Sequence, residues 1–183
     1  MHSYSNTSIS NYTMDAPSDE LSKDMTPESL NFREIEREKE RRQRLQNLES
    51  VSTPHAVHQN NFDPGRGNAL QAATASIFGL PLEDVPNFIE MPNGYEAAIR
   101  DFCQAGGSNP IKITIANIFE HIAAHSDYRG EICILRGKSP RGDFGHVVVA
   151  RQSGDGFEMI HDPHPEGTFL DSSEDFGWCM FFV

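Results

Sequence analysis

The stretch HVVVARQSGDGFEMIHD, residues 146–162, decides the fold. It contains two β-like runs, 146–152 and 156–162, and the sequence Ser-Gly-Asp-Gly between them is typical of a hairpin turn. An antiparallel hairpin returns the chain to its starting edge, so His146 at one end and Asp162 at the other can become neighbours. The stretch therefore predicts two antiparallel strands with a His–Asp pair at their rim.

The segments on either side of this hairpin extend the pattern. EICILRG (131–137) and WCMFFV (178–183) read as further strands, whereas GNALQAATASIFGL (67–80) and the amphipathic GYEAAIRDFCQAGG (94–107) read as helices. Residues 80–90 read as a turn with a short helical or extended segment, and 113–124 fit a strand or a helix equally well. Helices followed by an antiparallel sheet predict an α+β fold.

Residues 1–60 differ from the rest of the chain. The first thirty are rich in small polar residues and proline, and they cannot bury enough apolar surface to offset their ordering entropy, so we expect disorder. NFREIEREKERRQRLQNLES (31–50) contains good helix formers with mixed charges and a thin apolar stripe. It predicts a solvated helix or linker, with a partner-docking helix as the alternative. We expect an N-terminal extension over 1–60 and a folded domain over 61–183.

Composition excludes several function classes. The 183 residues include 27 acidic and 15 basic side chains, for a net charge of −12. This balance argues against nucleic-acid binding and against docking on an anionic membrane. No stretch approaches the ~18 apolar residues of a spanning helix, and the N-terminus has no secretory signal, which favours a cytoplasmic location. The cysteines, Cys103, Cys133 and Cys179, predict reduced, buried thiols rather than disulfides or a zinc site.

A glycine-rich turn, PGRGNA (64–69), leads into the first helix of the domain. The start of a helix offers unpaired N–H groups and a positive dipole end, which can activate a nucleophile and bind an oxyanion. A plain helix start with a flexible turn is the alternative. At the hairpin, Asp162 would fix the tautomer of His146 and stabilise its charged form, although His146 could equally be structural.

Two other chemistries fit less well. A metal site would use the histidines and aspartate around HDPHP (161–165), but the two prolines and the spacing do not match a helical HExxH motif. A serine hydrolase would need Ser76 or Ser139 in a GxSxG elbow, which the sequence lacks. We therefore expect no metal and no cofactor.

Three segments together resemble the small bacterial and phage type of papain-like cysteine hydrolase: GNALQAATASIFGLPLEDVPNFIE (67–90), SPRGDFGHVVVAR (139–151) and IHDPHPEG (160–167). They follow the family's order and spacing, and the match covers about residues 62–183. The resemblance implies a papain-like fold, with N-terminal helices packed on an antiparallel sheet. It also implies a Cys-His-Asp triad that acts on amide bonds of a protein or peptide, as a protease, a glutamine deamidase or a transglutaminase.

In this resemblance the nucleophilic cysteine falls on Ala69, which cannot attack a carbonyl. Either an active-site cysteine was replaced by alanine, or the protein is a natural pseudoenzyme that binds a protein or peptide. The first interpretation is favoured because the glycine turn, His146 and Asp162 persist.

The resemblance further implies an oxyanion hole made by the Ala69 N–H and an upstream polar side chain. The candidates for oxyanion or substrate binding are Asn68, Asn61, Gly67 and Gly145, with Asp63 a poorer donor. The charged N-terminus is compatible with an effector delivered into another cell. The acidic domain favours a basic substrate surface through long-range steering.

Overall fold

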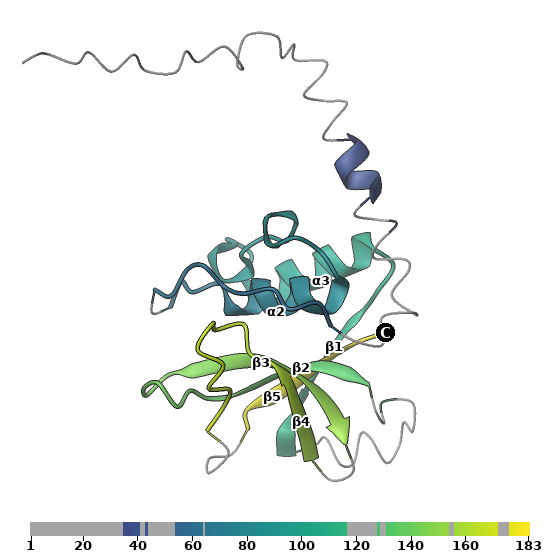
Figure 1. Cartoon of the computed structure of the whole chain (residues 1–183). Helices are drawn as coiled ribbons and strands as arrows, with labels where there is room; N and C mark the ends of the chain where they lie inside the picture. The colour runs from purple at the N-terminus through teal and green to yellow at the C-terminus, as the bar shows by residue number, and fades with distance from the viewer. Residues whose placement is uncertain are drawn as a thin grey trace, which may run out of the picture. The chain divides into compact units, whose positions relative to one another are not determined.

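The computed structural model describes residues 35–40, 43, 54–63, 65–116, 128, 131–153, 156–171 and 176–183 (Figure 1). The chain divides into two compact units, Met1–Ile35 and Glu36–Val183. Of the first unit only Ile35 is described, and the elements below all belong to the second. Among the described residues, no helix combines the length and the hydropathy needed to cross a bilayer.

Helices precede the sheet in the chain. The helix α2 (Ala69–Phe78) is followed by two short 3₁₀ turns, η2 (Leu82–Asp84) and η3 (Phe88–Glu90), and by α3 (Tyr95–Ala105). The described residues after α3 contain five strands: β1 (Pro110–Thr114), β2 (Ile132–Lys138), β3 (Gly145–Ser153), β4 (Gly156–His161) and β5 (Trp178–Phe182). They form one sheet in the order β1-β5-β2-β3-β4, with every neighbouring pair antiparallel. The expected α+β class is confirmed.

Most predicted elements lie close to observed ones, whereas β1 begins before the expected segment 113–124. The hairpin over 146–162 is formed by β3 and β4, which pair from Ser153 and Gly156 outward with one irregularity at Val149 and Ala150. The ambiguous segment 113–124 begins at the end of β1 and continues as a helical turn at 115–116, and the rest of it lies outside the described residues. The predicted disorder of residues 1–30 also lies outside them. Within 31–50, residues 35–40 and 43 are helical.

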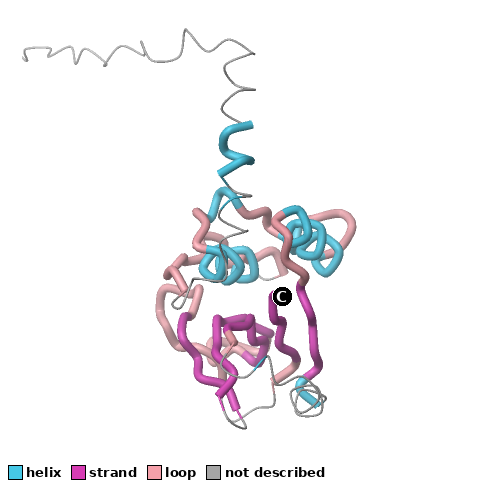
Figure 2. The backbone as a smooth tube through the Cα atoms, turned by 90° about the vertical axis from the view of Figure 1, so that its right-hand side faces the viewer, coloured by secondary structure: helices cyan, strands magenta, loops and turns pink. Residues whose placement is uncertain are grey.

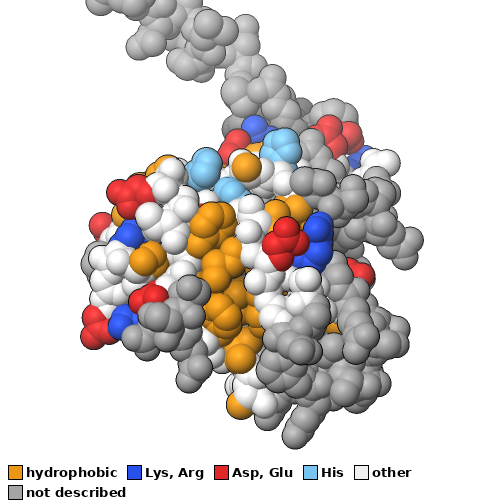
Figure 3. Space-filling view, turned by 60° about the horizontal axis from the view of Figure 1, so that its bottom comes forward, with side chains coloured by type: hydrophobic (Ala, Val, Ile, Leu, Met, Phe, Trp, Pro, Cys, Tyr) orange, Lys and Arg blue, Asp and Glu red, His pale blue; other side chains and the backbone are white. Residues whose placement is uncertain are grey.

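The sheet separates two apolar cores because alternate residues of its strands point to opposite faces. On β2, Ile134 packs in the core shared with α2 and α3, whereas Cys133 and Leu135 pack in the other core. Figures 1 and 2 show both helices on one side of the sheet. Figure 3 looks toward the sheet side, where hydrophobic side chains reach the surface as a strip.

The segment before residue 61 belongs to the folded unit, so the expected boundary between residues 60 and 61 lies too late. The N–H of His55 donates to the Ser76 carbonyl (2.9 Å), and the N–H of Gln59 donates to the Pro163 carbonyl (2.9 Å). The Ser76 hydroxyl also accepts from the N–H of Val57 (3.1 Å). These bonds attach residues 55–59 to α2 and to the turn after β4. Amino-acid composition could not locate this boundary, because residues 55–59 are attached through their backbone N–H groups, which every residue type except proline carries.

All three cysteines are free and fully buried, as expected. Burial raises the pKa of the Cys103 and Cys179 thiols to about 12, and it raises the pKa of Cys133 well above its usual value. None of them can supply a thiolate at neutral pH.

Candidate functional site

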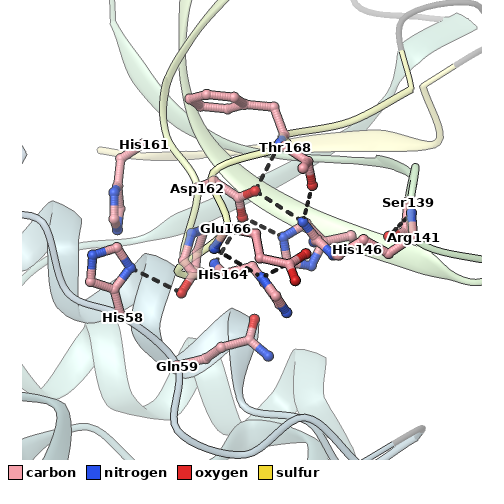
Figure 4. Close-up of polar contacts among 12 residues, drawn as sticks. His58, Gln59, Ser139, Arg141, His146, His161, Asp162, His164, Glu166 and Thr168 are labelled. Atoms are coloured by element: carbon pink, nitrogen blue, oxygen red, sulfur yellow. Dashed lines mark hydrogen bonds and ion pairs between the residues drawn. The ribbon is translucent and has the colours of Figure 1, made fainter.

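His146 and Asp162 form a buried pair at the open end of the β3–β4 hairpin. His146 is the second residue of β3 and Asp162 directly follows β4. The His146 Nε2 lies 2.7 Å from the Asp162 Oδ1, and both side chains are almost completely buried. Figure 4 shows the pair at the centre of a group of polar side chains from these strands and the loops beside them. The hairpin therefore brings together the two residues that its sequence places at its ends.

Asp162 is held by further donors. Its Oδ1 also accepts from the N–H of His164 (2.8 Å), and its Oδ2 accepts from the N–H of Phe169 (2.8 Å) and from Arg141 Nη1 (3.3 Å). Arg141 contacts the Thr168 hydroxyl as well, which fixes its guanidinium behind the carboxylate. The Asp162 carboxylate is thus an anchored acceptor.

The charge state of Asp162 determines the tautomer of His146. Burial acts to raise the pKa of the Asp162 carboxyl, but the hydrogen bonds from His146 and from the His164 N–H outweigh it and lower that pKa to about 2. An ionised carboxylate only accepts, so the proton of a neutral His146 lies on Nε2. The other ring nitrogen, Nδ1, then carries the lone pair that a general base needs.

Ala69 and His146 line the same pocket, a cavity of about 500 Å³ between the start of α2 and the sheet. Ala69 is the first residue of α2, where backbone N–H groups have no partner within the helix. The helix-side wall and the sheet-side wall are mostly apolar. The lining residues include Phe62, Leu70, Ile89, Tyr95, Phe144, Val147 and Trp178.

The four residues expected to bind an oxyanion or substrate divide into two pairs. Gly67 and Gly145 line the pocket, whereas Asn61 and Asn68 do not. The Asn68 Oδ1 accepts from the N–H groups of Asn60 and Asn61, and its Nδ2 donates to Asn60 Oδ1 and Gln71 Oε1. The Asn61 side chain accepts from the Asp63 N–H and donates to the Arg66 carbonyl. Both amides therefore fasten the glycine-rich loop, and neither is among the residues that line the pocket.

Sequence reasoning missed Gln59, which lines the pocket with Ala69 and His146. The side chain is buried; its Nε2 donates to the Asn61 carbonyl (3.1 Å), and its Oε1 has no hydrogen-bond partner among the described residues. An amide nitrogen has two hydrogens, so one remains for a ligand. Figure 4 shows Gln59 across from the histidines of the site. The family resemblance implies a polar donor upstream of Ala69, but the expected domain boundary after residue 60 left Gln59 outside the candidates.

The alternative chemistries have no support from the geometry. His161 Nε2 donates to the Val57 carbonyl (2.8 Å) and His58 Nδ1 to the Pro163 carbonyl (3.3 Å), so both histidines hold the N-terminal segment. In the part of the chain that the structure describes, no group of three metal-ligating side chains occurs. The Ser76 hydroxyl donates to the Ala72 carbonyl inside α2, and the Ser139 hydroxyl accepts from the Arg141 N–H.

A scan against protein-family models gives no match, and searches of the curated proteins and of the solved structures return no significant match either. The function proposed for this chain therefore depends on the geometry of the pocket and on the residues that line it.

Proposed function

We propose that this chain is a papain-like thiol hydrolase domain, acting on amide bonds of a protein or peptide, in which alanine occupies the position of the nucleophile. One observation carries the proposal: a buried imidazole, oriented by an ionised carboxylate, lines the same pocket as the first residue of a helix. A thiol at residue 69 would complete a nucleophile–base–orienter arrangement of the kind that drives acyl transfer.

The rim of the pocket supports a peptide ligand. Phe62 and Phe144 are more than half exposed and Ile89 is 40% exposed, and all three line the pocket. Large apolar side chains are rarely left in water together without a partner. Apolar walls with a few polar groups at their base are typical of ligand pockets of this size.

The mechanism follows from these positions. With cysteine at residue 69, the thiolate attacks the amide carbonyl while the backbone N–H of residue 69 and the Gln59 amide donate to the developing oxyanion. His146 gives a proton to the leaving amine, which departs as the thioester forms. His146 then takes a proton from water, whose oxygen attacks the thioester and releases the acid and the thiol. Asp162 orients the ring and stabilises the imidazolium in both halves.

Restoring the thiol with Ala69→Cys tests this directly. We expect rapid carbamidomethylation of the introduced thiol by iodoacetamide at pH 6–7, because the N-terminus of the helix and the imidazolium both favour the thiolate. The three native cysteines give a low background, since they are buried and their pKa values are raised. The control is the same substitution with His146→Ala, which should label at least tenfold more slowly. Equal, slow labelling of both variants would refute the proposal.

The reaction class is a separate question that mass spectrometry of products answers. A chain break after incubation with the Ala69→Cys variant indicates a protease, and a gain of about 1 Da at a glutamine indicates a deamidase. Joining to a lysine indicates a transglutaminase. The cytoplasmic location, delivery as an effector and partner docking through residues 31–50 are predictions that accompany this proposal.

The second candidate is a binding module, and Ala69 itself favours it. A cleft with all supporting groups and no nucleophile binds without cleaving. If the natural protein has alanine at this position and the unmodified chain holds a peptide tightly, this candidate replaces the first.

A further inference from the structure

Arg136 lines the pocket and has no counterion among the residues that the structure describes. Arg136, on β2, is half buried, and it forms no ion pair or hydrogen bond through its guanidinium with any residue that the structure describes. Its register partners on the two neighbouring strands are Val147 and Trp178, so the three side chains share one face of the sheet. All three line the pocket.

Two glycines make room for the guanidinium next to the reaction centre. A Cβ at Gly145 would lie 2.2 Å from Arg136 Nη2, and a Cβ at Gly177 would lie 3.2 Å from Nη1. Gly145 directly precedes His146 in β3. The guanidinium of Arg136 is therefore packed against the backbone of Gly145, the residue before His146, and both Arg136 and His146 line the pocket.

Within the described ranges, the lack of an ion-pair partner distinguishes Arg136 from Arg141 and Arg151. Arg141 pairs with Asp162, and Arg151 on β3 pairs with Glu158 at 3.6 Å. Removing a guanidinium partly from water without a counterion is unfavourable, and arginine is suited to binding a carboxylate with two parallel hydrogen bonds. Asp63, the acidic residue among the pocket lining, is exposed on the loop before α2 and forms no ion pair with Arg136.

We propose that Arg136 binds a carboxylate of the substrate, so that the preferred ligand is a peptide with a glutamate or aspartate next to the amide placed at His146. The neighbouring rings of Phe144 and Trp178 would cover the methylene groups of that side chain. This inference rests on the proposed function and specifies its substrate class.

The net charge of −12 repels an acidic peptide, whereas Arg136 attracts its carboxylate. The distance over which each interaction acts decides which of them dominates in the pocket. At physiological ionic strength the Debye length is about 8 Å, so repulsion from the rest of the acidic surface is largely screened. A contact ion pair inside a partly desolvated pocket is screened much less. Long-range steering thus slows the approach of an acidic peptide without removing the local preference.

The chain as written suits a binding test because Ala69 cannot consume the ligand. Trp178, the single tryptophan, lies in the pocket and stacks on Tyr95, so its fluorescence reports occupancy. The probes are acetyl-Ala-Ala-Glu-Ala-Ala-amide and the same peptide with glutamine, titrated at physiological salt with calorimetry as a second readout. We expect the glutamate peptide to bind about tenfold more tightly.

In Arg136→Met, which keeps an apolar stem, the two peptides should differ in affinity by no more than about twofold. In Arg151→Met, which removes an equal charge outside the pocket, the tenfold preference for the glutamate peptide should persist. Gly145→Ala should weaken it with the charge retained, because the new methyl displaces the guanidinium. Circular dichroism verifies that each variant is folded. Equal affinity for the two peptides, no binding of either, or an unchanged preference in folded Arg136→Met would overturn the inference.

The two proposals fail in different experiments. A reactive thiol in Ala69→Cys without a glutamate preference refutes the role of Arg136 alone. A glutamate preference that depends on Arg136, with an unreactive introduced thiol, refutes the hydrolase and leaves a carboxylate-binding pocket.

Discussion

Asp162 does two tasks at the scale of a single residue. Its Oδ1 fixes the His146 tautomer, and the same oxygen accepts from the His164 N–H. Its Oδ2 accepts from Arg141 and from the Phe169 N–H, which ties together the loops after β2 and β4. The carboxylate that orients the candidate base therefore also stabilises the fold, and its protonation affects both.

The pH dependence of unfolding measures this second task. Folding lowers the pKa of Asp162 from 3.8 to about 2, so its stabilisation is complete above about pH 5 and is lost as pH falls toward 2. The free energy of stabilisation that is lost is about 2 kcal/mol, because a shift of one pKa unit corresponds to about 1.4 kcal/mol. We expect Asp162→Asn to have a lower free energy of unfolding than the parent at pH 6. The difference in free energy of unfolding should be about 2 kcal/mol smaller at pH 2, because the parent loses the same stabilisation there. Urea unfolding measures both.

The exposed Asp143 provides the control for this comparison. Asp143→Asn removes an equal charge from an exposed side chain, so a difference that both variants share reflects the change in net charge alone. A gap between Asp162→Asn and the parent that stays constant from pH 6 to pH 2 would contradict the assigned role.

The sequence predicts the residues of the site unevenly, and the reason is physical. His146 and Asp162 are predictable because a hairpin of known register brings its ends together. Asn68 and Gln59 are not, because both are polar amides near the same helix and only the three-dimensional path of the loop decides their roles. Asn68 turns inward to hold that loop, and Gln59 reaches the pocket.

At the scale of elements, α2 depends on how it ends. Gly79 follows its last residue with φ 60° and ψ 32°, the left-handed conformation that lets the N–H of Leu80 reach the Ala75 carbonyl at 2.9 Å. A Cβ added there would meet nothing within 4 Å. Any cost of a side chain at this position is therefore backbone strain alone.

We expect Gly79→Ala to lower the free energy of unfolding by about 1 kcal/mol, and Gly79→Asn by less, because asparagine tolerates the left-handed region. Urea midpoints measure both. Gly156→Ala is the matched control, since that glycine of β4 also has open space around it but has no positive φ. Equal effects of the two alanine substitutions would show that the helix end is not under this constraint.

The elements themselves are largely predictable, and the exceptions are short. The glycine and proline signals placed α2, α3 and the β3–β4 hairpin within a few residues of their observed bounds. The strand β1 was partly missed because Pro110–Thr114 gains its identity from pairing with β5, a partner distant in sequence. The two 3₁₀ turns between α2 and α3 are too short for a periodic signal.

In the folded unit as a whole, the two apolar cores share strands, because β2 and β5 contribute side chains to both. Ile134 and Met180 face the helices, while their neighbours Cys133, Cys179 and Phe181 face the other core. Neither core can open fully without disrupting β2 or β5. The second unit of the chain should therefore unfold as one cooperative unit.

The buried cysteines test this cooperativity because they lie in both cores. Cys103 belongs to the helix-side core, and Cys133 and Cys179 belong to the core on the opposite face of the sheet. In pulsed thiol labelling across a urea series, followed by mass spectrometry, we expect all three to become reactive with the same midpoint. Their raised pKa values and full burial keep labelling of the native state negligible. If Cys103 reacted at clearly lower urea than Cys133, the helices would be separating from an intact sheet, and the start of α2 could no longer be treated as fixed relative to His146.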